Sequence, residues 1–187
     1  QVLRENPQQP LSLLDVASGG GDVTIALWRR AVAANRPLEI TGCDVSPTAV
    51  EHARQAAERA HADVRFVTRD MLADPPDELY DIVVCSLFLH HLTCDEAIQL
   101  LKAMRQTTRR LLLVNDLHRS LPGYLLATAA CRALTRSPVV HVDGPRSVAG
   151  AFTTGELHEL CQQAGLDAAT VSRRFPSRML LAWRAPQ

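Results

Sequence analysis

A glycine-rich turn near the start of the sequence is the feature that most directly indicates chemistry. Residues 13–22 read LLDVASGGGD, so an apolar run ends in three consecutive glycines. Glycine lets the backbone approach a ligand closely, and a helix that begins after the turn offers free N–H groups to an anionic end such as a carboxylate. The turn by itself predicts a nucleotide-like ligand held between a strand and a helix.

Two common nucleotide fingerprints do not fit this turn. A dinucleotide fingerprint, G-x-G-x-x-G counted from Gly19, would need a glycine where Thr24 stands, and no lysine follows the glycines as a P-loop would require. Asp15 also precedes the turn inside the apolar run, which a dinucleotide fold does not demand. An NAD-type oxidoreductase is therefore the less favoured alternative.

Asp44 ends the second apolar run, 25 residues beyond Gly19. A carboxylate at the end of this strand can accept hydrogen bonds from the two hydroxyls of a ribose. The alternative is an aspartate that only caps a helix, because Ser46 and Pro47 follow as a typical helix start. The glycine turn in the same sequence favours the ribose role.

The elements that must position these residues alternate between short apolar runs and longer amphipathic ones, which predicts a parallel α/β sheet with helices on both faces. Thr93 and Glu96, and again Thr153 and Glu156, have the spacing of a helix capping box. The last two strands are predicted to form a hairpin around Pro176. The predicted strands are 12–17, 38–44, 64–68, 80–85, 110–115, 169–175 and 179–184; helices are predicted at 22–34, 48–60 and 121–134, and a Pro/Gly-rich loop at 137–150.

Five motifs in this order resemble those of class I S-adenosylmethionine-dependent methyltransferases, nearest the ubiquinone/menaquinone-type small-molecule group. The resemblance implies a doubly wound Rossmann-like methyltransferase sheet of seven strands, mostly parallel, with an antiparallel strand in a C-terminal hairpin. The glycine turn departs from the commoner Gly-Cys-Gly-Thr-Gly form but keeps a small residue at every place. The motifs are DVASGGG (15–21), GCDVS (42–46), RDM (69–71), YDIVVCS (80–86) and LHHL (89–92).

The resemblance also implies S-adenosylmethionine as cofactor and S-adenosylhomocysteine as product. The turn would hold the methionine part and Asp44 the ribose. Val45 and Met71 would lie near the adenine, and Asp70 would accept a hydrogen bond from its amino group. Asp70 has a rival interpretation as a surface turn residue. Cys85 and Ser86 would contact the methionyl ammonium through their backbone. The implied cofactor-binding residues are Ala17, Ser18, Gly19, Gly21, Asp44, Val45, Asp70, Met71, Cys85 and Ser86.

The activity implied is methyl transfer to a small-molecule acceptor, a phenolic, quinone-like or polyketide-type O or C nucleophile. Segments 115–120, 141–145 and 147–153 resemble a bacterial subgroup associated with secondary metabolism, in which arginine usually stands at the position of His118. A non-catalytic S-adenosylmethionine-binding module stays open as an alternative. The cofactor carries the reactive group, so no catalytic residue is fixed; the candidate bases are His90, His91, His118 and His141.

Composition limits partners and compartment. The 187 residues carry 20 basic and 20 acidic side chains, a balance that argues against a dedicated nucleic-acid binder. Five cysteines without a CxxC pair argue against a disulfide framework or a metal site and favour the cytoplasm. No apolar run reaches the roughly 20 residues of a membrane span. A homodimer stays open as an alternative.

The chain is predicted to be one methyltransferase domain over residues 1–187. Methyl transfer requires a site shielded from water, so residues 118–152 are expected to cover the substrate side. The first strand begins abruptly after about ten residues, and an N-terminal lid is therefore expected to be missing from this sequence.

Overall fold

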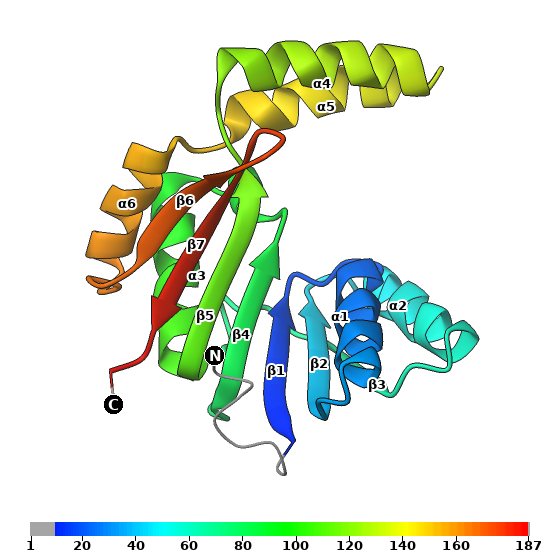
Figure 1. Ribbon diagram of the computed structural model, residues 1–187, viewed down its shortest axis with the longest axis vertical. Helices are drawn as coiled ribbons and strands as arrows, with labels where there is room; N and C mark the ends of the chain where they lie inside the picture. The colour runs from blue at the N-terminus through cyan, green and yellow to red at the C-terminus, as the bar shows by residue number, and fades with distance from the viewer. Residues whose placement is uncertain (1–9, 187) are drawn as a thin grey trace.

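Seven strands form one sheet in the order β3-β2-β1-β4-β5-β7-β6 in the computed structural model, which describes residues 10–186 (Figure 1). The strands are β1 (Leu11–Val16), β2 (Leu38–Asp44), β3 (Val64–Thr68), β4 (Tyr80–Ser86), β5 (Thr108–Leu117), β6 (Thr170–Arg174) and β7 (Arg178–Arg184). The helices are α1 (Asp22–Ala33), α2 (Pro47–Arg59), η2 (Leu89–His91), α3 (Cys94–Thr107), α4 (Leu121–Leu134), α5 (Pro138–Gly150) and α6 (Thr154–Gln163). The expectation of a missing N-terminal lid concerns the segment before β1, most of which lies outside the described residues.

The topology confirms the predicted sheet. Strands β1 to β5 pair in parallel, and β7 pairs antiparallel with both β5 and β6. The chain moves outward through β2 and β3 on one side of β1 and through β4 and β5 on the other. The order therefore reverses between β1 and β4, and the carboxyl ends of these strands form the crevice in which such sheets bind ligands.

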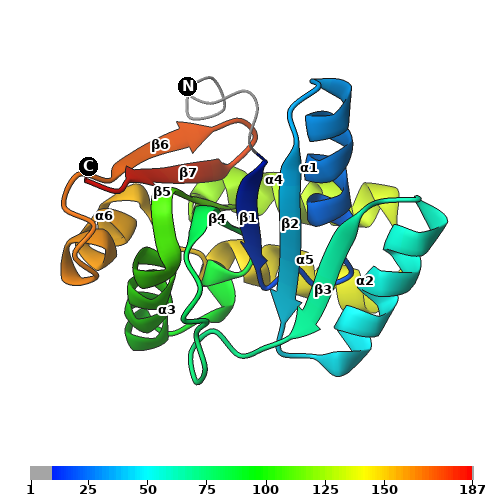
Figure 2. The same ribbon diagram turned by 90° about the horizontal axis from the view of Figure 1, so that it is seen from below.

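Helices cover both faces of the sheet (Figure 2). On one face, α1 and α2 pack through Ile25, Val50 and Ala53 onto Phe66 of β3. On the other face, α3 and α6 pack onto β1, β4 and β5 in the largest apolar cluster. Strand β4 is buried along nearly its whole length, as its continuous apolar sequence predicts for a central strand.

Ser12 and Asp81 fix the register of β1 against β4 at the amino end of the sheet. The Asp81 carboxylate accepts hydrogen bonds from the backbone N–H of Ser12, at 3.1 Å, and from its hydroxyl, at 3.3 Å. The Ser12 hydroxyl oxygen in turn accepts from the Asp81 backbone N–H at 3.0 Å. The side chains of Arg109 and Arg110 form ion pairs with the same buried carboxylate, so its charge is compensated.

Helix starts follow the local signals in the sequence. The side chains of Thr93 and Thr153 each accept a hydrogen bond from the backbone N–H of the glutamate three residues later. The carboxylate of each glutamate accepts one from the backbone N–H of its threonine, so both predicted capping boxes are present. Ser46 caps α2 through Ala49. Every predicted strand begins and ends within two residues of its observed bounds.

The prediction of a loop at residues 137–150 is wrong, because this segment is helix α5. Pro138 occupies the first helical turn, where proline costs no hydrogen bond, but Pro145 lies inside the helix. A Cβ on Gly144 would clash with the Cys131 sulfur, so this glycine allows α5 to lie close against α4. The close packing at Gly144 thus overrides the low helix propensity of glycine.

Helices α4 and α5 form a hairpin above the carboxyl ends of β4, β1 and β2, and both views show this placement (Figures 1 and 2). The hairpin meets the rest of the molecule at its base. Gly150 lies against the His90 carbonyl, at 3.3 Å from a Cβ built there, and Gly123 lies against the Ser177 side chain of the β6–β7 turn. Among residues 10–186, no helix is long and apolar enough to cross a membrane.

Candidate functional site

The turn after β1 has a backbone that depends on its small residues. Ala17, Gly19 and Gly21 all have positive φ, at 54°, 53° and 82°. A Cβ on Gly21 would also lie 2.7 Å from the Phe66 ring, so two independent constraints require glycine there. Ala17 adopts the left-handed conformation at a cost of about 1–2 kcal/mol. Strained non-glycine residues cluster at functional sites, and Leu87, after β4 at the same sheet edge, is a second example, with φ 58°.

Asp44 connects the glycine turn to the start of α2. One carboxylate oxygen accepts a hydrogen bond from the Gly19 backbone N–H at 2.9 Å, and the other accepts from the Ser46 N–H at 2.9 Å. Each carboxylate oxygen has about two acceptor positions, so both retain one for a ligand hydroxyl. The side chain is only half-buried and lines a cavity, which leaves these positions accessible.

Asp15 lies beneath the turn and is almost inaccessible to water. Its carboxylate accepts a hydrogen bond from the Thr24 hydroxyl at 2.6 Å. Burial raises the pKa of Asp15 to about 6, although the Thr24 hydrogen bond opposes this shift. Thr24, the residue that breaks the dinucleotide fingerprint, is therefore the partner of the strand aspartate.

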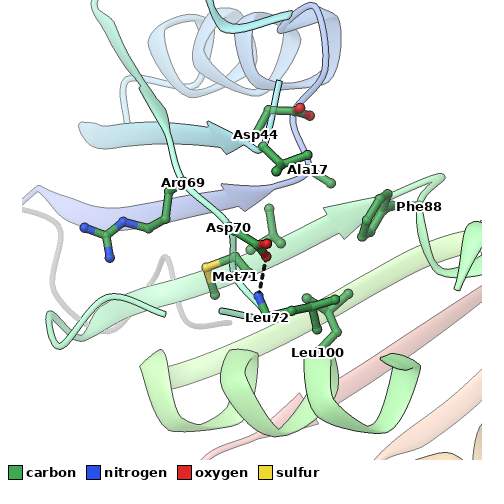
Figure 3. A pocket seen from close by; sticks show the side chains of 10 residues that line it. Ala17, Asp44, Arg69, Asp70, Met71, Leu72, Phe88 and Leu100 are labelled. Atoms are coloured by element: carbon green, nitrogen blue, oxygen red, sulfur yellow. Dashed lines mark hydrogen bonds between the residues drawn. The ribbon is translucent and has the colours of Figure 1, made fainter. Parts of the chain in front are cut away.

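An open cavity lies at the carboxyl ends of β1 and β2 and beside α3 (Figure 3). Five of the ten residues predicted to bind a cofactor line it: Ala17, Asp44, Val45, Asp70 and Met71. The remaining lining residues are Val16, Arg69, Leu72, Phe88 and Leu100, of which only Val16 and Arg69 belong to the quoted motifs.

The position of Asp70 is compatible with both of its interpretations. One carboxylate oxygen accepts hydrogen bonds from the backbone N–H groups of Leu72, at 2.8 Å, and Ala73, at 3.3 Å, so it shapes the turn after β3. The same residue faces the cavity together with Met71 (Figure 3). The neighbouring Arg69 forms an ion pair with Asp74 at 3.2 Å, which links the two ends of the turn after β3 on its solvent side.

The other five predicted residues do not line this cavity. Gly19 and Gly21 act through the shape of the turn, and the hydroxyl oxygen of Ser18 is buried without a hydrogen-bond partner within the described residues. The Cys85 side chain is fully buried, and burial raises the pKa of its thiol well above the usual value. Cys85 could therefore reach a ligand only through its backbone, as could the adjacent Ser86 at the end of β4.

The structure brings His90 and Asp116 together. The Nδ1 atom of His90 lies 2.6 Å from the Asp116 carboxylate, and both side chains are buried. Asp116 also accepts hydrogen bonds from the backbone N–H groups of His90, at 3.3 Å, and Leu117, at 2.6 Å. A carboxylate fixed in this way keeps the proton of a neutral imidazole on Nδ1 and leaves Nε2 as the acceptor.

The Nε2 atom of His90 has no hydrogen-bond partner in the part of the chain that the structure describes. The His90 side chain is 6% exposed, and Nε2 is the ring nitrogen that Asp116 does not engage. Phe88, two residues before it, lines the cavity described above.

The three other candidate histidines have different surroundings. His91 is exposed, and its ring lies 4.1 Å from that of His90. His118 is buried behind the β6–β7 turn, and burial together with Arg173 lowers its pKa. The Nε2 atom of His141 lies 2.7 Å from the Thr135 carbonyl, so this ring closes the end of α4 onto α5. Of the four, His90 is the one that the structure pairs with an orienting carboxylate.

Comparison with known proteins is consistent with this geometry. A family model described as a methyltransferase domain matches residues 13–110, slightly more than half of the chain. Demethylmenaquinone methyltransferase of Thermus thermophilus is 40% identical over 75 residues, which are 40% of this chain and 32% of that protein. Ribosomal protein L11 methyltransferase of Burkholderia lata is 36% identical over 85 residues, 46% of this chain and 26% of that protein. The matches thus span about a third or less of these relatives.

Solved structures extend the fold similarity to nearly the whole chain. Magnesium protoporphyrin IX methyltransferase from Synechocystis PCC 6803, solved with bound SAH, superposes with a TM-score of 0.66. The similarity covers 95% of this chain and 75% of that one at 19% sequence identity. At this identity the comparison establishes the fold.

Proposed function

Because this chain belongs to the methyltransferase domain family, we propose that it transfers a methyl group from S-adenosylmethionine to a hydroxyl oxygen of a small phenolic or quinone-like acceptor. The observation that carries the choice of a hydroxyl is the His90–Asp116 pair at the edge of the sheet where the cavity opens. The match to a demethylmenaquinone methyltransferase supports a quinone-like acceptor.

The residues around the cavity fit the cofactor. The glycine turn has the close-approach backbone that a methionine moiety would need, and the unpartnered Ser18 hydroxyl could supply a hydrogen bond there. Asp44 retains acceptor positions for ribose hydroxyls, and the cavity is lined by apolar side chains near Asp70 that suit an adenine ring. When bound, S-adenosylmethionine supplies an electrophilic methyl group.

The protein's part in the reaction is to position the acceptor, exclude water and accept a proton. Nε2 of His90 takes the proton of the acceptor hydroxyl as its oxygen attacks. The imidazolium that forms is stabilised by the Asp116 carboxylate at 2.6 Å. Asp116 is a positioning residue, because it contacts the histidine and acts through it.

The hairpin of α4 and α5 is proposed as the substrate-side cover, within residues 118–152. It lies above the edge at which the cavity opens, and α5 meets His90 through Gly150 (Figure 1). A closed cover would keep water from the acceptor oxygen during transfer.

The first experiment measures binding of S-adenosylmethionine, S-adenosylhomocysteine and NAD by calorimetry. The proposal expects the first two to bind and NAD not to bind. Tritium transfer from labelled S-adenosylmethionine to a panel of phenols and hydroquinones then tests catalysis. Binding without transfer to any acceptor would favour the non-catalytic module, and labelling of a protein acceptor would redirect the proposal to that class.

The second experiment tests the base. His90→Ala should reduce turnover of a phenol about 10²- to 10⁴-fold at neutral pH, because general-base catalysis contributes that much. The deficit should shrink as the pH approaches the pKa of the acceptor, about 10 for a phenol, because the acceptor then ionises unaided. His158→Ala on the exposed face of α6 is the matched control. A pH-independent deficit would assign His90 to structure instead.

A further inference from the structure

Leu87, the first residue after β4, is poorly suited to both its backbone and its surroundings. Its φ is 58°, in the left-handed region that disfavours a leucine and that glycine or asparagine would adopt more readily. Its side chain is 39% exposed and belongs to none of the apolar clusters formed by residues 10–186. Neither packing nor local conformation accounts for a leucine here, and strained residues of this kind indicate a functional role.

The residues around Leu87 already have defined contacts. Phe88 lines the cavity (Figure 3), Leu89 is fully buried in the core, and His90 is paired with its carboxylate. The backbone N–H of Leu87 donates a hydrogen bond to the Asn115 carbonyl of β5 at 2.9 Å, which holds its strained backbone in place. Of residues 87–90, Leu87 is therefore the one whose side chain has no packing role within the described chain.

Leu87 lies between the cavity and the proposed base. Strand β4 has β1, whose end borders the cavity, on one side and β5, which carries Asp116, on the other. In the proposed reaction the acceptor oxygen attacks the methyl group while His90 takes its proton, so the acceptor must occupy the same interval. The cavity is lined by Phe88 but not by Leu87, which leaves the Leu87 side chain available to the acceptor.

We propose that the Leu87 side chain forms an apolar wall of the acceptor subsite and selects acceptors with an apolar ring. The inference rests on the proposed function, because that function places the acceptor between cofactor and base. An aromatic ring packed against a leucine buries apolar area of both groups, whereas a charged ring substituent would lose its water there. The fixed backbone orients the side chain before the acceptor binds, which lowers the entropy cost of binding.

The test measures by calorimetry the binding of naphthol, a two-ring phenol, to the 187-residue chain saturated with S-adenosylhomocysteine. Leu87→Ala should weaken naphthol binding about tenfold or more, because the ring loses its apolar contact. The affinity for S-adenosylhomocysteine should stay that of the parent chain, since Leu87 does not line the cavity. Leu79→Ala is the matched control, because this leucine is 43% exposed and lies at the opposite end of β4, and it should leave naphthol binding unchanged.

Selectivity is measured with a sulfonated naphthol. The parent chain should prefer naphthol, and Leu87→Asn, which keeps a side chain of similar size but makes it polar, should lower this preference about tenfold or more. Equal naphthol affinities in the parent chain and Leu87→Ala would overturn the proposal. An unchanged preference in Leu87→Asn, or a parent chain that does not bind naphthol, would overturn it as well.

Two further measurements separate this inference from its premises. Leu87→Gly should unfold at a higher urea concentration than Leu87→Ala, because only the alanine retains the cost of the left-handed backbone, and equal midpoints would contradict the inferred strain. Methyl transfer that is the same in Leu87→Ala, Leu79→Ala and the parent chain would refute the role of Leu87 and leave the proposed function standing. Naphthol binding that depends on Leu87, in a parent chain that transfers no methyl group, would support the subsite and refute the proposed function.

Discussion

Replacing Gly21 by alanine should destabilise the fold by an amount that the structure allows us to calculate. The residue has φ 82°, and the left-handed conformation costs an alanine about 1–2 kcal/mol. The new Cβ would lie 2.7 Å from the Phe66 ring and 3.0 Å from the Ala53 Cβ, an overpacking that typically costs about 1–3 kcal/mol. Together the free energy of unfolding should fall by about 2–5 kcal/mol.

Urea denaturation measures this change, with the slope m required to stay constant. Gly20→Ala is the matched control, because no atom lies within 4 Å of its Cβ position and its φ is not positive. Adding Phe66→Leu to Gly21→Ala should relieve the clash with the ring, but the free-energy cost of the left-handed backbone at residue 21 should remain. If Gly21→Ala unfolds at the same urea concentration as Gly20→Ala, the account of this turn is wrong.

Three further changes have defined outcomes. Asp44→Ala should weaken S-adenosylmethionine binding by about 2–4 kcal/mol in calorimetry while the chain stays folded, and unchanged affinity would misplace the ribose. Burial raises the pKa of Asp15 to about 6, so its contribution to stability is largest below its unfolded pKa near 3.8 and is lost as the pH rises through 6. Relative to the parent chain, Asp15→Asn should therefore gain up to about 3 kcal/mol between pH 4 and pH 7.5, and parallel pH profiles would contradict this. Thr153→Ala should cost about 1 kcal/mol in thermal or urea unfolding by removing a capping box, whereas Thr154→Ala, one residue later, should cost less.

The sequence predicts the sheet well because its strands are short apolar runs of regular spacing. Buried parallel strands need apolar residues on both faces, so β4 can be predicted from the sequence alone. The antiparallel hairpin can be predicted equally well, because Pro176 and Ser177 separate the two predicted strands. Helix α5 was not predicted, since Gly144 and Pro145 carry the local signal of a loop and only the contact with Cys131 reveals the packing role of Gly144.

The residues of the candidate site were likewise predicted only in part. Asp44 and Asp70 could be predicted because they lie at or just after the ends of strands, in recognisable motifs. Leu100 could not, because it repeats at helical spacing with core residues of α3 and only the tertiary structure turns it toward the cavity. The His90–Asp116 pair joins residues 26 apart. His90 follows β4 and Asp116 lies near the end of the adjacent parallel strand β5, and that adjacency was the available signal.

The pairing of β1 with β4 has a consequence for how the chain folds. Ser12 and Asp81 are 69 residues apart, whereas Gly19 and Asp44, which β1 and β2 bring together, are 25 apart. Closing the longer loop costs about 1 kcal/mol more chain entropy. Strands β1, β2 and β3 can therefore associate before β4 arrives, and the centre of the sheet is completed by a non-local contact. Because the contacts of Asp81 form late in this order, substitutions at Asp81 should speed unfolding more than they slow folding.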